Sequence, residues 1–204
     1  MTQGNAENLA LSHEDALRAD LYEFIGSLLR KEPEDSLIEK VAALSGDQTD
    51  MGSAFSTLAR LASSLDTATI RDEYVSLFIG VGRGEVLPFA SYYLTGFLHE
   101  KPLANLRADM AAMGVARADG VKDPEDHIAS LMDIMAGMIR GDYGRAYSID
   151  EQATFFNKHL AKWAGLVFRD IEAAKTAVFY APLGTIGRLF MDIEAQGFDM
   201  GAKG

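Results

Sequence analysis

The chain has no cysteine among its 204 residues. Without thiols it can form no disulfide, no thiolate metal site and no cysteine nucleophile. Its four histidines, His13, His99, His127 and His159, also lack the i, i+4 spacing with which a helix presents two imidazoles to zinc. We therefore expect neither a metal nor a cofactor.

Positive charge is also scarce, because 19 Lys and Arg face 30 Asp and Glu, for a formal net charge of -11. Such a surface repels phosphate backbones and anionic lipid, which argues against nucleic acid and stable membrane insertion. No apolar run reaches transmembrane length, and the N-terminus MTQGNAENLALSHEDALRAD lacks the basic and apolar regions of a secretory signal. We expect a cytoplasmic protein whose acidic field favours basic partners.

Strand-like alternation is nearly absent, whereas apolar residues recur at helical spacing along most of the chain. Hydrophobic residues make up 48% and charged residues 24%, the balance of a folded globule. The sequence predicts one all-α domain over residues 1–204, a helical bundle with its core at about 12–196 and loose termini. The clearest stripes are Leu17, Leu21, Leu28 and Leu29; Ile70, Tyr74, Leu77 and Phe78; Ile128, Leu131, Met132, Met135 and Ile139; and Phe156, Leu160, Trp163 and Val167.

Three acid- or hydroxyl-led sequences resemble helix starts: Ser12 with Asp15, Ser148 with Glu151, and Asp123 with Asp126. In the last of these, Asp123 would cap the helix and Pro124 would take its first position. The segments 80–93, 114–123 and 140–148 are predicted breaks between helices, because glycine, proline and polar residues interrupt the apolar period there.

Catalytic chemistry has one candidate, an acid-base pair of Asp126 and His127 completed by Glu73 or His159. Neighbouring residues on a helix point about 100 degrees apart, so Asp126 and His127 do not orient each other in an obvious dyad. No Gly-x-Ser-x-Gly elbow accompanies them. The glycines of GVGRGE lack the Gly-Lys-Ser/Thr of a phosphate loop, and they are better explained as a turn after a helix.

Aromatic residues gather between positions 74 and 93, where five of the chain's 18 Phe and Tyr fall. Tyr74, Leu77 and Phe78 share a helix face and suit core packing. The second group follows a glycine-rich break, and loops carry so many aromatics when they fold back on the bundle or line a groove. That group consists of Pro88, Phe89, Ser91, Tyr92 and Tyr93.

Three segments together resemble the TorD/DmsD family of redox-enzyme maturation chaperones. They are DEYVSLFIGVGRGEVLPFASYY, DPEDHIASLMDIM and FFNKHLAKWAGLVFRDIEAAKTAVFYAPLG, in the family's order and spacing. The likeness covers roughly residues 14–196, and the Pro-x-Asp-His element is its most specific part. Asp123 stands where the family usually has Glu, which keeps the charge.

The resemblance implies a cytoplasmic chaperone rather than an enzyme. Such a protein binds the twin-arginine signal peptide and the apo-form of a molybdopterin oxidoreductase, and it delays export until the cofactor has been inserted. Asp126, with Asp123 or Glu125, would meet the arginines, and His127 would bind peptide backbone or orient a carboxylate. The apolar part of the peptide would contact a groove lined by Tyr74, Leu77, Phe78, Pro88, Phe89, Ser91 and Tyr92.

Two other functions stay open from sequence: a small hydrolase built on Asp126 and His127, and a helical scaffold that reads no signal peptide. On the chaperone reading, Asp126→Ala is expected to weaken client binding more than it lowers stability. Whether the chain is a monomer or a dimer, and which oxidoreductase it serves, does not follow from the residues.

Overall fold

The computed structural model describes residues 11–117 and 123–201, and within these ranges the chain is helical with no strand. Its elements in chain order are α1 (His13–Arg30), α2 (Asp35–Ala42), α3 (Asp50–Ser64), α4 (Thr67–Tyr74), the π-helix η1 (Val75–Ile79), α5 (Ala90–Thr95), α6 (Lys101–Ala112), α7 (Ile128–Arg140), α8 (Ile149–His159), α9 (Ala164–Ala173) and α10 (Tyr180–Gly201). The all-α prediction is confirmed.

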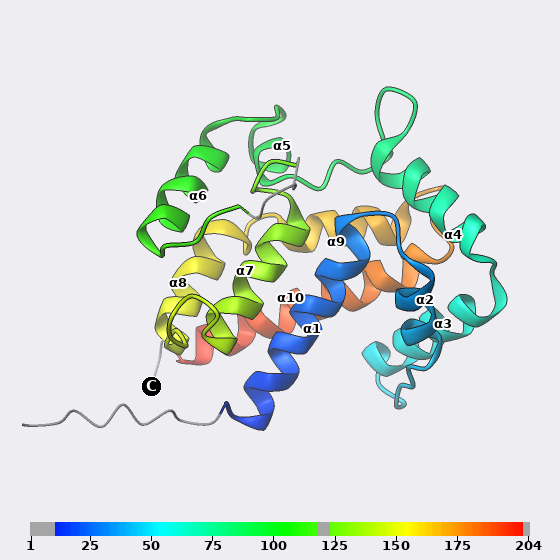
Figure 1. The fold of residues 1–204 in the computed structure, drawn as a ribbon, viewed down its shortest axis with the longest axis horizontal. Helices are drawn as coiled ribbons and strands as arrows, with labels where there is room; N and C mark the ends of the chain where they lie inside the picture. Colours follow the sequence, from blue (N-terminus) through cyan, green and yellow to red (C-terminus); the bar gives the residue numbers. More distant parts are fainter. Residues whose placement is uncertain (1–10, 118–122, 202–204) are drawn as a thin grey trace, which may run out of the picture.

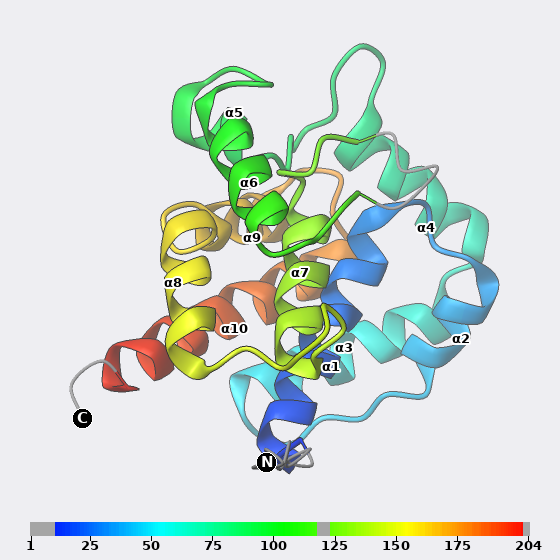
Figure 2. The same cartoon turned by 60° about the vertical axis from the view of Figure 1, so that its left-hand side comes forward.

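Helices α1 and α7 pack along each other through the centre of the molecule, and α9 packs against α10 behind them (Figure 1). The helices α2, α3 and α4 lie on one side of this centre, and α5, α6 and α8 lie on the other in both views (Figures 1 and 2). The apolar stripes predicted from sequence supply the core, whose largest fully buried side chains include Trp163, Tyr22, Tyr180 and Phe156. None of the described helices is both long and apolar enough to cross a membrane.

Two of the three predicted helix starts are confirmed. Ser12 caps α1 by accepting a hydrogen bond from the Asp15 amide, and Ser148 forms a complete capping box with Glu151 at α8. The sequence predicts a loose C-terminus, and in the structure α10 continues to Gly201 with Phe198 buried. Residues 1–10 and 202–204 lie outside the described ranges.

The break at 80–93 is a loop only in its first part, since Ala90–Thr95 forms the short helix α5. Before the loop, η1 ends at Ile79 and is followed by Gly80, whose φ of 61° lies in the left-handed region that favours glycine. A Cβ at Gly80 would also lie 2.0 Å from the carbonyl oxygen of Arg83, so this turn requires glycine. The segment after α4 loops out from the body in both views (Figures 1 and 2).

A buried carboxylate fixes the start of α10. Glu73, at 7% exposure, accepts hydrogen bonds from the amides of Val178, Phe179 and Tyr180 at 2.8, 2.9 and 2.8 Å. These amides lie at the start of a helix and have no acceptor within it. The carboxylate from α4 supplies that acceptor, and the positive end of the helix dipole stabilises its negative charge. Glu73 thus ties α4 to α10 across the chain.

Candidate functional site

The Pro-x-Asp-His element precedes α7 instead of opening it. The helix begins at Ile128, and the cap is His127, whose Nδ1 accepts a hydrogen bond from the Ala129 amide at 3.1 Å. The prediction that Asp123 caps this helix and Pro124 takes its first position was therefore wrong. Pro124 instead accepts a hydrogen bond from the His127 amide in a turn. Imidazole is an uncommon cap, which is why the acid-rich residues before it gave the misleading signal.

Asp126 is fully buried and anchors the loop to α7. Its Oδ2 accepts a hydrogen bond from the Ser91 amide at 2.8 Å, and its carbonyl accepts one from the Ala90 amide at 2.9 Å. Both donors lie in the first turn of α5, so Asp126 caps α5 from a distant part of the chain. Asp126 Oδ1 and Ser91 Oγ are buried without a hydrogen-bond partner among the described residues.

Pro88, Phe89 and His127 complete the same junction. The Ile128 amide donates to the Pro88 carbonyl at 2.8 Å, and Phe89 and His127 form an isolated antiparallel bridge. Their rings meet edge to face with centroids 5.0 Å apart. Five of the predicted site residues, Pro88, Phe89, Ser91, Asp126 and His127, are thus brought together by direct contacts.

The buried position of His127 predicts a loss of stability in acid. Burial lowers its pKa from the usual 6.5 to about 4, with a smaller contribution from Arg30. The folded protein therefore binds the proton more weakly than the unfolded chain does, so this stability is complete above pH 6.5 and is lost as the pH falls from 6.5 towards 4. His127→Asn keeps a capping oxygen and cannot titrate.

As the pH falls from 6.5 towards 4, we expect the free energy of unfolding to decrease less in His127→Asn than in the unchanged protein. Urea unfolding followed by circular dichroism at a series of pH values measures the difference. Parallel losses in the two proteins would show that His127 does not carry the acid sensitivity.

The first aromatic group, Tyr74, Leu77 and Phe78, spans the end of α4 and the π-helix η1. Leu77 is fully buried, Tyr74 is 5% exposed, and the Tyr74 and Phe78 rings lie 5.0 Å apart. Phe78 also meets Tyr180 edge to face at 5.4 Å and is half-buried. Core packing explains Tyr74 and Leu77, whereas Phe78 reaches the surface. Leu77 joins this group to the loop, because its carbonyl accepts from the Val86 amide at 2.9 Å.

Two apolar residues that sequence reasoning missed extend this surface. Ile79 is 52% exposed, and Val81, in the loop itself, is fully exposed. Ile79 ends the π-helix η1 on a face other than that of buried Leu77, and Val81 follows the turn at Gly80. The signal available in the sequence was the run VSLFIGV, in which apolar residues outnumber those that one helix face can bury.

Two acidic side chains act electrostatically on this aromatic group. Asp123 and Glu32 are both exposed. Burial is the main reason that the pKa of the Tyr74 hydroxyl is raised, and the negative charges of Asp123 and then Glu32 add to the shift. Glu125 differs, because its carboxylate accepts from Arg107 at 2.7 Å. Asp123 therefore presents the more available carboxylate.

Tyr92 lies on the exposed side of α5, where the Arg83 guanidinium contacts its hydroxyl and lies 5.0 Å from its ring centre. Arg83 comes from the loop, so Tyr92 holds the loop's far side against the bundle. Tyr93, one residue later, packs on Trp163 at 5.6 Å and donates to Asp170. The sequence predicts that the aromatic residues after Pro88 either fold back on the bundle or line a groove. In the structure they fold back on the bundle.

The groups of the hydrolase hypothesis do not converge. Glu73 binds the amides of α10, Asp126 binds that of Ser91, and His127 caps α7. His159 Nε2 lies 2.6 Å from an oxygen of Asp109. Burial lowers the pKa of His159, and the contact with Asp109 opposes that shift. No three His, Asp or Glu side chains in residues 11–117 and 123–201 gather as a metal site. Each candidate group has its own structural partner.

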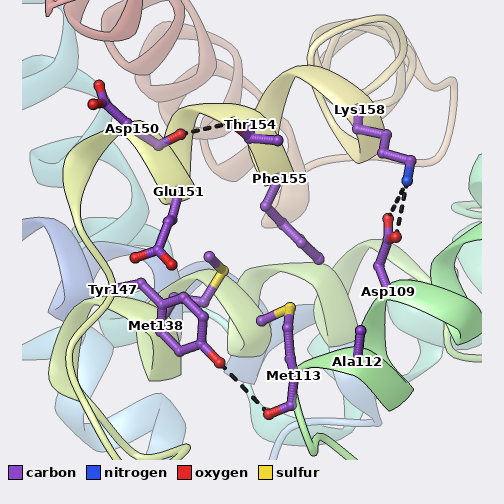
Figure 3. A pocket seen from close by; sticks show the side chains of 10 residues that line it. All are labelled: Asp109, Ala112, Met113, Met138, Tyr147, Asp150, Glu151, Thr154, Phe155 and Lys158. Atoms are coloured by element: carbon purple, nitrogen blue, oxygen red, sulfur yellow. Dashed lines mark hydrogen bonds and ion pairs between the residues drawn. The ribbon is translucent and has the colours of Figure 1, made fainter.

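Two cavities border α7, and one of them lies at the predicted site. One of about 180 Å³ lies at the predicted motif, and its lining includes Asp123, Glu125, His127, Arg30 and Asp133. A more apolar cavity of about 350 Å³ lies between α6, α7 and α8, where Met113, Met138 and Phe155 point inward beneath a charged rim (Figure 3). None of the predicted site residues lines this second cavity.

In the described residues the fold is helical, apolar side chains and carboxylates are exposed, and His127, His159, Glu73 and Asp126 are engaged in structural bonds, which is typical of a binding protein. The family model described as nitrate reductase delta subunit matches residues 45–169, more than half of the chain. The chain belongs to this family, the TorD family of redox-enzyme maturation chaperones, and is a chaperone rather than an enzyme.

Curated relatives of similar sequence are also named as chaperones. Chaperone protein TorD of Vibrio cholerae serotype O1 (strain ATCC 39541) is 26% identical over 166 residues, which cover 72% of this chain and 76% of that protein. Chaperone protein TorD of Vibrio atlanticus is 22% identical over 202 residues, 88% of this chain and 93% of the relative. A putative redox enzyme maturation protein from Archaeoglobus fulgidus has the same fold, with a TM-score of 0.62 at 21% identity, over 91% of this chain and 99% of that one.

Proposed function

We propose that this chaperone binds the twin-arginine signal peptide and the apo-form of a molybdopterin oxidoreductase in the cytoplasm, and that it assists cofactor insertion before export. The supporting observations are that the exposed carboxylates of Asp123 and Glu32 act electrostatically on the Tyr74 hydroxyl, and that Tyr74 packs on Phe78, which is followed in the chain by the exposed apolar residues Ile79 and Val81. A signal peptide carries the matching pair of features, a guanidinium pair followed by an apolar stretch. Carboxylates bind guanidinium groups with two parallel hydrogen bonds.

In this proposal the predicted site residues divide into two roles. Asp123, Phe78, Phe89 and Tyr92 are at least partly accessible and contact the peptide. The buried residues Tyr74, Leu77, Pro88, Ser91, Asp126 and His127 hold the loop in position. Asp126 is assigned to positioning because its carboxylate has no exposure to solvent.

The experiment is a titration of the full chain with a labelled twin-arginine peptide and with the same peptide carrying alanine at both arginines. We expect tighter binding of the first, and we expect the double variant Glu32→Gln, Asp123→Asn to weaken it by about fivefold, as the loss of exposed ion pairs predicts. Asp192→Asn with Asp199→Asn removes two exposed carboxylates from α10 and is the matched control. Equal affinity for the two peptides would reject signal-peptide reading.

A further inference from the structure

A cavity of about 450 Å³ between α5, α6 and the end of α8 differs in charge from the rest of this acidic protein. Its lining includes Lys101, Lys158, Lys162 and His159, with the amides of Asn105 and Asn157, and it includes no Asp or Glu. Among 204 residues with a net charge of -11, this is a local reversal of sign. None of the predicted site residues lines it, and its link to that site is Ala90, whose amide donates to the Asp126 carbonyl.

Not every lysine there is available. Lys158 reaches Asp109 at 2.6 Å, as the dashed lines of Figure 3 show, and His159 shares the same carboxylate. Lys101 and Lys162 are exposed and form no ion pair with any residue of the described ranges. Two lysines without an ion pair among the described residues therefore line the cavity, together with the amide side chains of Asn105 and Asn157.

The floor of the cavity is apolar. Ala90, Leu94, Leu106 and Leu131 line it, and Leu94 is 41% exposed. The segment between α5 and α6, whose flanking residues Thr95 and Lys101 both line the cavity, carries Phe97 and Leu98, which are 70% and 39% exposed. A free phosphate or pyrophosphate would make no favourable contact with the apolar part of the lining. A peptide with both acidic and apolar side chains would fit both the lysines and the apolar residues.

We propose that this cavity and the adjoining residues Phe97 and Leu98 form a second docking surface, which binds an acidic, apolar peptide segment of a client protein. Lys101 and Lys162 pair with its carboxylates, and Leu94, Phe97 and Leu98 contact its apolar side chains. The surface is opposite in charge to the one proposed for the signal peptide, so one client can engage both. This inference does not depend on twin-arginine recognition.

The test uses the full chain and a fluorescein-labelled synthetic peptide built from glutamate, leucine and phenylalanine. Control peptides carry glutamine for every glutamate, or serine for every apolar residue. The double variant Lys101→Gln, Lys162→Gln should bind the parent peptide about tenfold more weakly, the loss expected for two partly screened ion pairs. Lys40→Gln with Lys175→Gln removes the same charge at exposed positions elsewhere and should leave binding unchanged.

Weakening that is equal in the two double variants would mean nonspecific attraction and would overturn the proposal. So would an absence of binding by the unchanged protein, or binding that survives loss of the apolar residues and is displaced by inorganic pyrophosphate, which would indicate a small-anion site. A change in sedimentation caused by Lys101→Gln, Lys162→Gln alone would assign the surface to self-association instead. Twin-arginine peptide affinity, measured on the same variants, should not change, and this separates the two surfaces.

Discussion

Glu73→Ala is expected to lower the free energy of unfolding by about 3 kcal/mol, because it leaves three opening amides of α10 without an acceptor. These amides belong to a segment in which Phe179 and Tyr180 are fully buried, so water cannot easily replace the carboxylate. The alanine also leaves a void between α4 and α10. Chemical denaturation followed by circular dichroism measures the loss.

The matched variant for this prediction is Glu73→Gln, which keeps one acceptor oxygen and nearly the same volume. It should retain part of the stability that alanine removes. Glu39→Ala, at an exposed position on α2, controls for the loss of a carboxylate as such. If Glu73→Ala unfolds at the same urea concentration as Glu39→Ala, the carboxylate does not hold α10 in solution.

Asp126→Ala is expected to cost about 2 kcal/mol of stability and to free the loop at residues 80–89. The variant removes the acceptor of the Ser91 amide in a fully buried setting, so the first turn of α5 loses its cap. This replaces the sequence-based expectation that the same change would act mainly on binding. Any loss of signal-peptide affinity would follow from the displaced loop.

Limited proteolysis distinguishes this loop effect from general unfolding. Arg83 is exposed in the loop, so trypsin should cleave after it faster in Asp126→Ala than in the unchanged protein. Asp126→Asn keeps an acceptor oxygen and should restore much of the protection. Unchanged stability and cleavage together with weaker peptide binding would instead make Asp126 a direct contact.

Local patterns were sufficient where neighbouring residues decide the structure. The Ser148 cap and its Glu151 partner lie three positions apart, and the stripe from Ile128 to Ile139 is the buried face of α7. The same patterns failed at Asp123, because an acid before a proline favours a helix start wherever the rest of the chain permits one. Here the backbone instead pairs with the loop, through the Phe89 and His127 bridge, and the helix starts four residues after Pro124.

The sequence by itself determined the helical class, the position of most breaks and the family resemblance, since each depends on spacing along the chain. Only the tertiary structure decided what Asp126, His127 and Glu73 do, because their partners lie in α5, within α7 and before α10. Burial separated the two acids of the motif: Asp126 became a cap and Asp123 stayed at the surface. No periodicity encodes that difference, because it arises from which distant segment packs over each side chain.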